Sequence, residues 1–134
     1  MKKACFIALL AAGAALSGCK TNVGVDSSAN PVATYDQMAG KFYGEIGGTV
    51  PSVYKAANIA LERNLGYMRT GKNDDDPNAV KIRARTRSDQ LVYVTVKRGD
   101  KSNRVLVEVE VDGGDLMDSQ QIFNAIAKEA RGGQ

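Results

Sequence analysis

The stretch VKIRARTRSDQLVYVTVKRGDKSNRVLVEVEV, residues 80–111, decides the fold. Apolar and polar residues alternate in it with a period of two over three separate runs, the pattern of strands with one buried face. Short connections at 88–90 and 99–103 join these runs, so we expect a three-stranded antiparallel meander. Valine dominates the expected inward face, which comprises Val80, Ile82, Ala84, Val92, Val94, Val96, Val105, Val107, Val109 and Val111.

The outward face of the meander combines arginine, tyrosine and aliphatic side chains. Tyrosine with arginine is a composition typical of protein interfaces. This face is therefore a candidate interaction surface. Its candidate residues are Arg83, Arg85, Tyr93, Leu106 and Glu108.

A second interpretation concerns the first run alone. Lys81, Arg83, Arg85 and Arg87 recur at every second position, which places cations about 7 Å apart along one strand face. Such a row suits a polyanion, and the candidate ligands are lipid headgroups, lipopolysaccharide and anionic glycan.

Charge balance across the sheet competes with both functional interpretations. If Arg85 pairs with Tyr93, then Tyr93 lies across from Glu108 and Leu91 across from Glu110. The acidic residues then lie one strand beyond the basic row. A solvated face with local charge balance is favoured on these grounds.

An amphipathic helix precedes the meander. Pro51 suits its first turn, because the missing N–H of proline is no loss there, and Gly66 is the expected C-cap. Its apolar stripe is Val53, Tyr54, Ala57, Ala60, Leu61 and Leu65.

A second helix follows the turn at 112–115. Asp118 is its expected N-cap, with Gln121 as the partner in a capping box, and Gly132 ends it. Its apolar stripe is Ile122, Phe123, Ile126, Ala127 and Ala130.

Two weaker strands complete the expected domain, residues 41–131. Residues 41–50 predict a short or edge strand that glycines weaken, and Tyr67 and Met68 start another. The valine face and both helix stripes need cover, and each supplies it to the other. We therefore expect an α+β two-layer sandwich, with two helices packed on one face of a mostly antiparallel four- to five-stranded sheet.

The first residues have the three parts of a secretion signal. Lys2 and Lys3 precede an apolar run at 6–16, and a run this much shorter than about 20 residues cannot span a bilayer. Leu-Ser-Gly-Cys, residues 16–19, resembles the bacterial lipobox. The resemblance implies that residues 1–18 are a lipoprotein signal peptide and that Cys19 becomes the lipidated N-terminus; an ordinary signal peptide is the alternative.

Two or more acyl chains give lasting attachment to a bilayer, so we expect a membrane-anchored protein. Residues 19–40 are small and polar and predict a flexible tether. Lys20 stands where aspartate in similar lipoproteins signals inner-membrane retention. We therefore expect the outer membrane of the cell envelope, with the domain facing the periplasm.

Composition excludes several kinds of chemistry. The sequence has no histidine, and Cys5 and Cys19 are its two cysteines. If Cys5 leaves with the signal and Cys19 is lipidated, no thiol remains. Without histidine, Cys-His and Ser-His-Asp catalysis are excluded, and without histidine and thiol so are the commonest transition-metal sites. We expect no catalytic residue, no cofactor and no enzyme activity.

Charge and the acidic run narrow the partners further. Removal of Lys2 and Lys3 reduces the 18 basic side chains of the chain to 16, which nearly balance the 15 acidic ones and give no support for binding nucleic acid. Residues Asp74–Asp76 offer oxygen ligands for a cation, but the glutamate that ends a calcium loop is missing, which favours a solvated loop.

The region 40–131 resembles a group of small bacterial lipoproteins of unknown function. The resemblance rests on GKFYGEIGGTVPSVYKAANIALERNLGY, the meander and GGDLMDSQQIFNAIAKEA. It departs from that group in the polar insert 72–78. It implies the fold and the anchor but no activity. The shared closing residues are Gly114, Asp115, Ser119 and Ile122.

Two functional hypotheses follow. The first is a non-enzymatic envelope lipoprotein that acts as an interaction or structural module through the outward sheet face, with an envelope protein as partner. The alternative is a binder of an anionic envelope ligand through the basic row that begins at Lys81.

Overall fold

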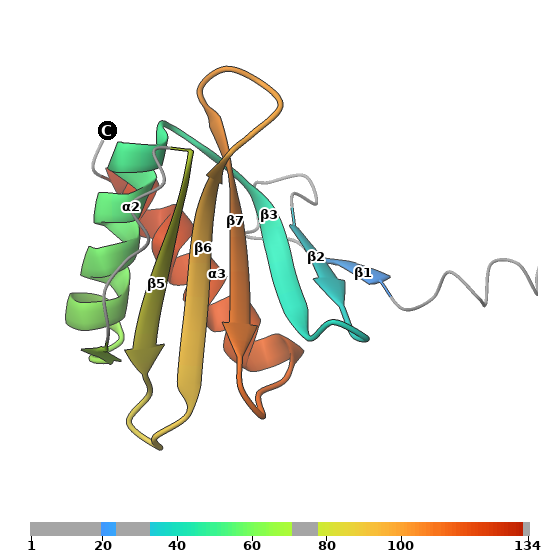
Figure 1. The fold of residues 1–134 in the computed structure, drawn as a ribbon, viewed down its shortest axis with the longest axis vertical. Coiled ribbons are helices and arrows are strands. Elements are labelled where there is room, and N and C mark those ends of the chain that lie inside the picture. Colours follow the sequence, from blue (N-terminus) through green and yellow to red (C-terminus); the bar gives the residue numbers. More distant parts are fainter. Residues whose placement is uncertain (1–19, 24–32, 71–77, 133–134) are drawn as a thin grey trace, which may run out of the picture.

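The structure, a computed structural model, describes residues 20–23, 33–70 and 78–132. These residues form one antiparallel sheet in the order β1-β2-β3-β7-β6-β5-β4 and two helices on a single face of it (Figure 1). The predicted signal peptide, Cys19 and the acidic run at 74–76 lie outside the described residues. The elements are β1 (Lys20–Val23), β2 (Ala33–Asp36), β3 (Lys41–Gly47), α2 (Val50–Ile59), the π-helical turn η1 (Ala60–Asn64), β4 (Met68–Arg69), β5 (Ala79–Arg85), β6 (Leu91–Arg98), β7 (Arg104–Val111) and α3 (Leu116–Gly132).

The predicted α+β class with two helices is confirmed, but the sheet has seven strands where we expected four or five. The additional strands β1 and β2 lie within the span 19–40 that we predicted to be a tether. Ala33 and Tyr35 of β2 are buried, and β2 pairs with β3 from Ala33↔Gly44 to Asp36↔Lys41. The prediction was wrong for these segments because polar composition does not prevent backbone pairing.

The core lies between the helices and the alternating inward residues of the strands. Val94, Val107 and the other central valines have no exposed surface, as the period-two pattern predicted. Phe42 of β3 meets Phe123 of α3, with the ring centroids 5.1 Å apart and the rings tilted by 54°. β3 lies between β2 and β7, so it is an interior strand and the edge position that we allowed for it is wrong.

Helix α2 begins with a reciprocal cap. The Thr49 hydroxyl accepts the Ser52 N–H at 3.3 Å, and the Ser52 hydroxyl accepts the Thr49 N–H at 2.9 Å. Pro51 occupies the first turn as expected. The helix ends through η1, and Gly66 follows with φ +68°, the left-handed conformation that a C-cap glycine adopts.

The N-cap of helix α3 lies three residues earlier than predicted. The Asp115 carboxylate accepts the Asp118 N–H at 3.1 Å, and the Asp118 carboxylate accepts the Asp115 N–H at 3.3 Å. Asp118 is therefore the third helical residue of a capping box, and Asp115 is the N-cap. Sequence alone did not separate the two aspartates, since each is followed three residues later by a possible partner.

The register of the meander is two residues away from the predicted one. Arg83 pairs with Tyr93 and Arg85 with Leu91, while Tyr93 pairs with Glu110. Between β5 and β6 the reason is the longer turn, where the Thr86 N–H donates to the Gln90 carbonyl at 2.9 Å. Between β6 and β7 the register is set at the loop 99–103, where the Gly99 N–H donates to the Arg104 carbonyl at 3.0 Å. A shift of two residues keeps every side chain on its predicted face but changes its neighbours across the sheet.

Candidate functional site

The face of the sheet opposite the helices carries a shallow hollow of about 450 Å³. Strands β3, β7, β6 and β5 all contribute to it, because their outward residues project from the same side. Neither helix covers this face (Figure 1). We call this face of the sheet the open face. The hollow on it is lined by Lys41, Ala79, Val80, Lys81, Tyr93, Thr95, Lys97, Glu108 and Glu110.

Two contacts order the side chains at the hollow. The Lys97 Nζ donates to the Glu108 Oε1 at 3.1 Å, across a diagonal between β6 and β7. The Lys81 Nζ lies 5.2 Å from the centre of the Tyr93 ring, within the range of a cation–π interaction. The hollow thus combines a neutralised ion pair with a lysine that rests on an aromatic ring.

Cross-strand pairing places opposite charges side by side at the rim of the hollow. Glu110 of β7 lies between two neighbours: Lys41 on β3 and Tyr93 on β6. Glu108 lies between Thr95 and Tyr43. The surface therefore has mixed charge, which fits a partner with charges of both signs better than a uniform polyanion.

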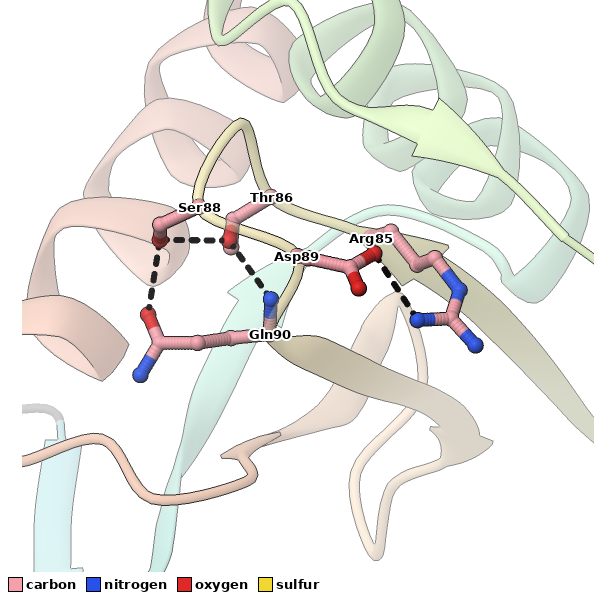
Figure 2. A network of polar contacts seen from close by, with 5 residues as sticks. All are labelled: Arg85, Thr86, Ser88, Asp89 and Gln90. Carbon is pink, nitrogen blue, oxygen red and sulfur yellow. Dashed lines mark hydrogen bonds and ion pairs between the residues drawn. The ribbon is translucent and has the colours of Figure 1, made fainter.

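The basic row of β5 does not act as one cationic stripe. The Arg85 guanidinium donates to the Asp89 carboxylate at 2.9 Å, and Asp89 belongs to the turn that follows the strand (Figure 2). On the other side of this turn, Gln90 N–H donates to the Thr86 hydroxyl at 3.0 Å. Asp89 itself has φ +68°. The turn geometry therefore neutralises one of the four predicted cations locally.

Arg87 lies off the row, because β5 ends at Arg85. It lines a separate hollow of about 240 Å³ together with Tyr67, Asp118 and Ile122. Burial raises the pKa of the Tyr67 hydroxyl above its usual value; the Asp118 carboxylate raises it further, while the Arg87 guanidinium lowers it. The row of four cations thus reduces to Lys81 and Arg83 on the open face, with Arg85 paired to Asp89.

The predicted interaction residues share one face, as expected, but they do not form one cluster. Arg83 neighbours Tyr93, whereas Glu108 neighbours Thr95 and Leu106 neighbours Lys97. Their role in binding stays a prediction. The hollow also includes residues that we did not single out from the sequence: Lys41, Thr95, Lys97 and Glu110.

A signal for one of these residues was present in the sequence. In β3, Lys41, Tyr43 and Glu45 alternate with the buried Phe42 and Ile46. The same period-two reasoning that identified the meander would have placed Lys41 on the open face. The glycines of this strand hid the alternation.

Two further observations concern chemistry and membranes. Within 20–23, 33–70 and 78–132, no three His, Cys, Asp or Glu side chains come together as metal ligands would. In the same part of the chain, neither helix has the length and hydropathy needed to cross a bilayer.

Comparison with known protein families matches residues 3–129 to the family described as "Protein of unknown function (DUF3568)". The chain belongs to this family. The match covers nearly the whole sequence, from the basic start of the N-terminal segment to the last turns of α3. Comparison with curated proteins finds no match. The resemblance to a group of unknown function is thereby confirmed at the level of the family and the two-helix α+β fold.

Proposed function

We propose that this member of the DUF3568 family is a lipoprotein of the bacterial cell envelope that binds a partner through the open face of its sheet, without catalysis. The hollow on that face is the observation that carries the binding part, because the described helices cover the other face of the same strands. The anchor rests on the sequence: a basic start, a short apolar run and Leu-Ser-Gly-Cys at 16–19.

The family match supports a functional role for the N-terminal segment, because the match includes this segment. It begins at residue 3, so the apolar run and Cys19 belong to the region that the family shares. In this proposal residues 1–18 are removed, Cys19 is lipidated, and the domain faces the periplasm from the outer membrane.

The side chains of the open face support a protein partner with mixed charge. Tyr93 supplies a large amphipathic surface at low entropic cost, and Lys81 already lies over its ring. Around it, the Lys97–Glu108 pair and the neighbours Lys41 and Glu110 present both signs of charge. Such alternation specifies the register of a partner more than it contributes affinity.

An anionic ligand is the second candidate, and one observation favours it. Lys41, Lys81 and Lys97 come from three different strands, and all three line the same hollow. A carboxylate or phosphate group there would meet more cations than anions. Binding of this kind weakens as salt is added, because exposed charges are screened over about 10 Å at 0.1 M salt.

The anchor is tested by Cys19→Ala. Wild-type protein from bacterial cells should be found with membranes and carry the mass of acyl chains, while the variant should be released and still give the circular dichroism spectrum of a folded domain. A Cys19→Ala protein that has lost residues 1–18, as its intact mass would show, and still stays with the membranes would refute the anchor, as would wild-type protein without acyl mass.

The open face is tested by photo-crosslinking in cells. A crosslinking amino acid at position 95, in the hollow, should give a discrete adduct that Lys81→Glu abolishes. The matched control is position 55, because Lys55 is exposed on α2 and belongs to the helix layer. Equal adducts from positions 95 and 55 would count against a specific site, and a salt-sensitive phospholipid or glycan adduct at 95 would select the second candidate.

A further inference from the structure

The end of the sheet at which β1 begins also carries the turn between β2 and β3. The pairs Lys20↔Asp36 and Asp36↔Lys41 place Lys20 one strand away from the turn at 37–40. Because neighbouring strands are antiparallel, the turns at 86–90 and 112–115 lie at this same end (Figure 1). Lys20, the residue that follows Cys19, therefore lies at the end of the sheet that carries these three turns.

The same end carries three exposed methionines. Met38, Met68 and Met117 are 84%, 70% and 74% exposed, and within 33–70 and 78–132 they are the large hydrophobic side chains left open to solvent. Met38 lies in the turn at 37–40, and Met117 is the second residue of α3, which follows the turn at 112–115.

Met68 belongs to this end through its pairing. It lies across from Arg85, the last residue of β5 before the turn at 86–90. The opposite end of the sheet, at the loop 99–103, contains the exposed polar residues Asp100, Lys101 and Ser102. Exposed hydrophobic side chains are therefore spread along the end of the sheet at which β1 begins, from Met38 beside β2 to Met68 on the far edge strand β4, and we call this end the methionine end.

The entry point leaves little room between lipid and protein. Consecutive Cα atoms lie 3.8 Å apart, so a lipid on Cys19 would hold Lys20 within one residue of the bilayer surface. The headgroup layer on each side of a bilayer is roughly 5–8 Å thick. With β1 starting at Lys20, the methionine end comes to the height of the headgroups.

We infer that the methionine end rests on the bilayer that holds Cys19, with Met38 inserted between the headgroups and Met117 close behind it. This inference rests on the proposed lipid anchor. Methionine is flexible and apolar, which suits an irregular lipid surface. The strands then rise from the membrane, and the open face stands upright beside it, accessible to a partner in the periplasm.

The contact is apolar and not electrostatic. Asp36 accepts the Met38 and Ala39 N–H groups at 3.1 and 3.2 Å, and the Asp115 and Asp118 carboxylates cap the first turn of α3. These carboxylates keep their negative charge, and the exposed Lys41 lies across from Asp36, so this end carries charges of both signs and, in the part of the chain that the structure describes, has no basic cluster to attract anionic lipid. Added salt should therefore leave the contact unchanged.

Fluorescent labels at single cysteines test this orientation. The full chain with Met38→Cys, Met117→Cys or Ser102→Cys is produced in bacterial cells, purified with its acyl chains and reconstituted into phosphatidylethanolamine–phosphatidylglycerol vesicles. Each thiol then receives an environment-sensitive fluorophore. All three positions are exposed, so the substitutions should not affect folding.

Vesicles with brominated acyl chains should quench the label at position 38 several-fold more than the label at 102, with 117 between them. The loop at 102 is the matched control, since an eight-residue strand separates the two ends by roughly 25 Å. Quenching at 38 should not change between low and high salt.

Three outcomes would overturn the inference, and they differ from one another. Equal quenching at 38 and 102, in acylated and vesicle-bound protein, refutes the orientation and leaves the anchor standing. A label at 38 that is shielded from aqueous iodide but not quenched by brominated lipid indicates that protein, such as a second copy, covers this end. Protein that lacks acyl chains and does not bind vesicles refutes the anchor and the orientation together.

Discussion

The two faces of the sheet use the same strands for opposite purposes. On the helix side, Val94 and Val107 are fully buried. On the open side, their direct neighbours in sequence, Thr95 and Glu108, line a hollow. The comparison shows that one alternating pattern encodes a core and a candidate binding surface at once, because successive side chains of a strand point to opposite faces.

The two faces also differ in how much they contribute to the stability of the fold. Burial of apolar area provides the main stabilisation, and it is concentrated on the helix side. The ion pair of the open face is partly solvated, since the Lys97 side chain is 42% and the Glu108 side chain 22% exposed. The open face is therefore free to be selected for binding, with small consequences for folding.

The largest expected contrast lies between neighbouring aromatic residues of β3. Phe42→Ala removes a fully buried ring that packs on Phe123 and should lower the free energy of unfolding by about 3–5 kcal/mol. Tyr43→Ala, on the open face, should cost about 1 kcal/mol. Urea denaturation of both variants measures the contrast. Equal losses would mean that the two faces are not energetically distinct.

A smaller contrast separates two threonines. Thr49→Ala removes the cap of α2 and should cost about 1 kcal/mol of unfolding free energy. The same substitution at Thr95 on the open face should change it by less than about 0.5 kcal/mol. Thermal unfolding followed by circular dichroism checks both. A larger loss at Thr95 would show that the open face has a structural role that its contacts do not indicate.

On the open face itself, the ion pair should contribute little. A double-mutant cycle with Lys97→Met and Glu108→Gln should give a coupling energy of about 0.2–1 kcal/mol, because both side chains are partly solvated. The coupling should decrease as sodium chloride is added. A coupling well above this range would indicate that the pair is shielded from water in solution.

The smallest expected effect concerns Tyr67 at the margin of the helix layer. Its pKa is raised in the folded protein, so the native state keeps the proton when the unfolded state loses it. Stability from this source is fully present below pH 10 and decreases as the pH rises through the folded pKa. The Tyr67→Phe variant should therefore lose less stability than the wild-type protein at strongly alkaline pH, and the two should be equally stable at pH 7. A pH titration of the unfolding midpoint tests this, and an equal alkaline loss in both proteins would contradict it.

Local patterns were enough to predict the meander and both helices. The valine alternation assigned every inward residue from Ile82 to Val111 to the correct face, since face depends only on parity along the strand. The helix stripes predicted the buried residues Val53 and Phe123 for the same kind of reason. These features need no knowledge of distant partners.

Features that depend on pairing could not be predicted in the same way. The register was wrong by two residues because it depends on how the connections close, through the Thr86–Gln90 hydrogen bond between β5 and β6 and the Gly99–Arg104 hydrogen bond between β6 and β7. Strands β1 and β2 were missed because each has four residues, too few for an alternating pattern to identify it, and they are held in the sheet by pairing of β1 with β2 and of β2 with β3. The N-cap of α3 required the geometry that distinguishes Asp115 from Asp118.

The sequence by itself determined which residues face inward, which helices cover them, and how residues 1–19 lead to the hypothesis of a lipid anchor. Only the tertiary structure decided that three lysines from three strands share one hollow, that Arg85 is neutralised by Asp89, and that Met38, Met68 and Met117 lie at one end. The physical reason is that periodicity acts along a single segment. A surface, in contrast, is assembled from segments far apart in the chain, and their register is fixed by turns and backbone pairing.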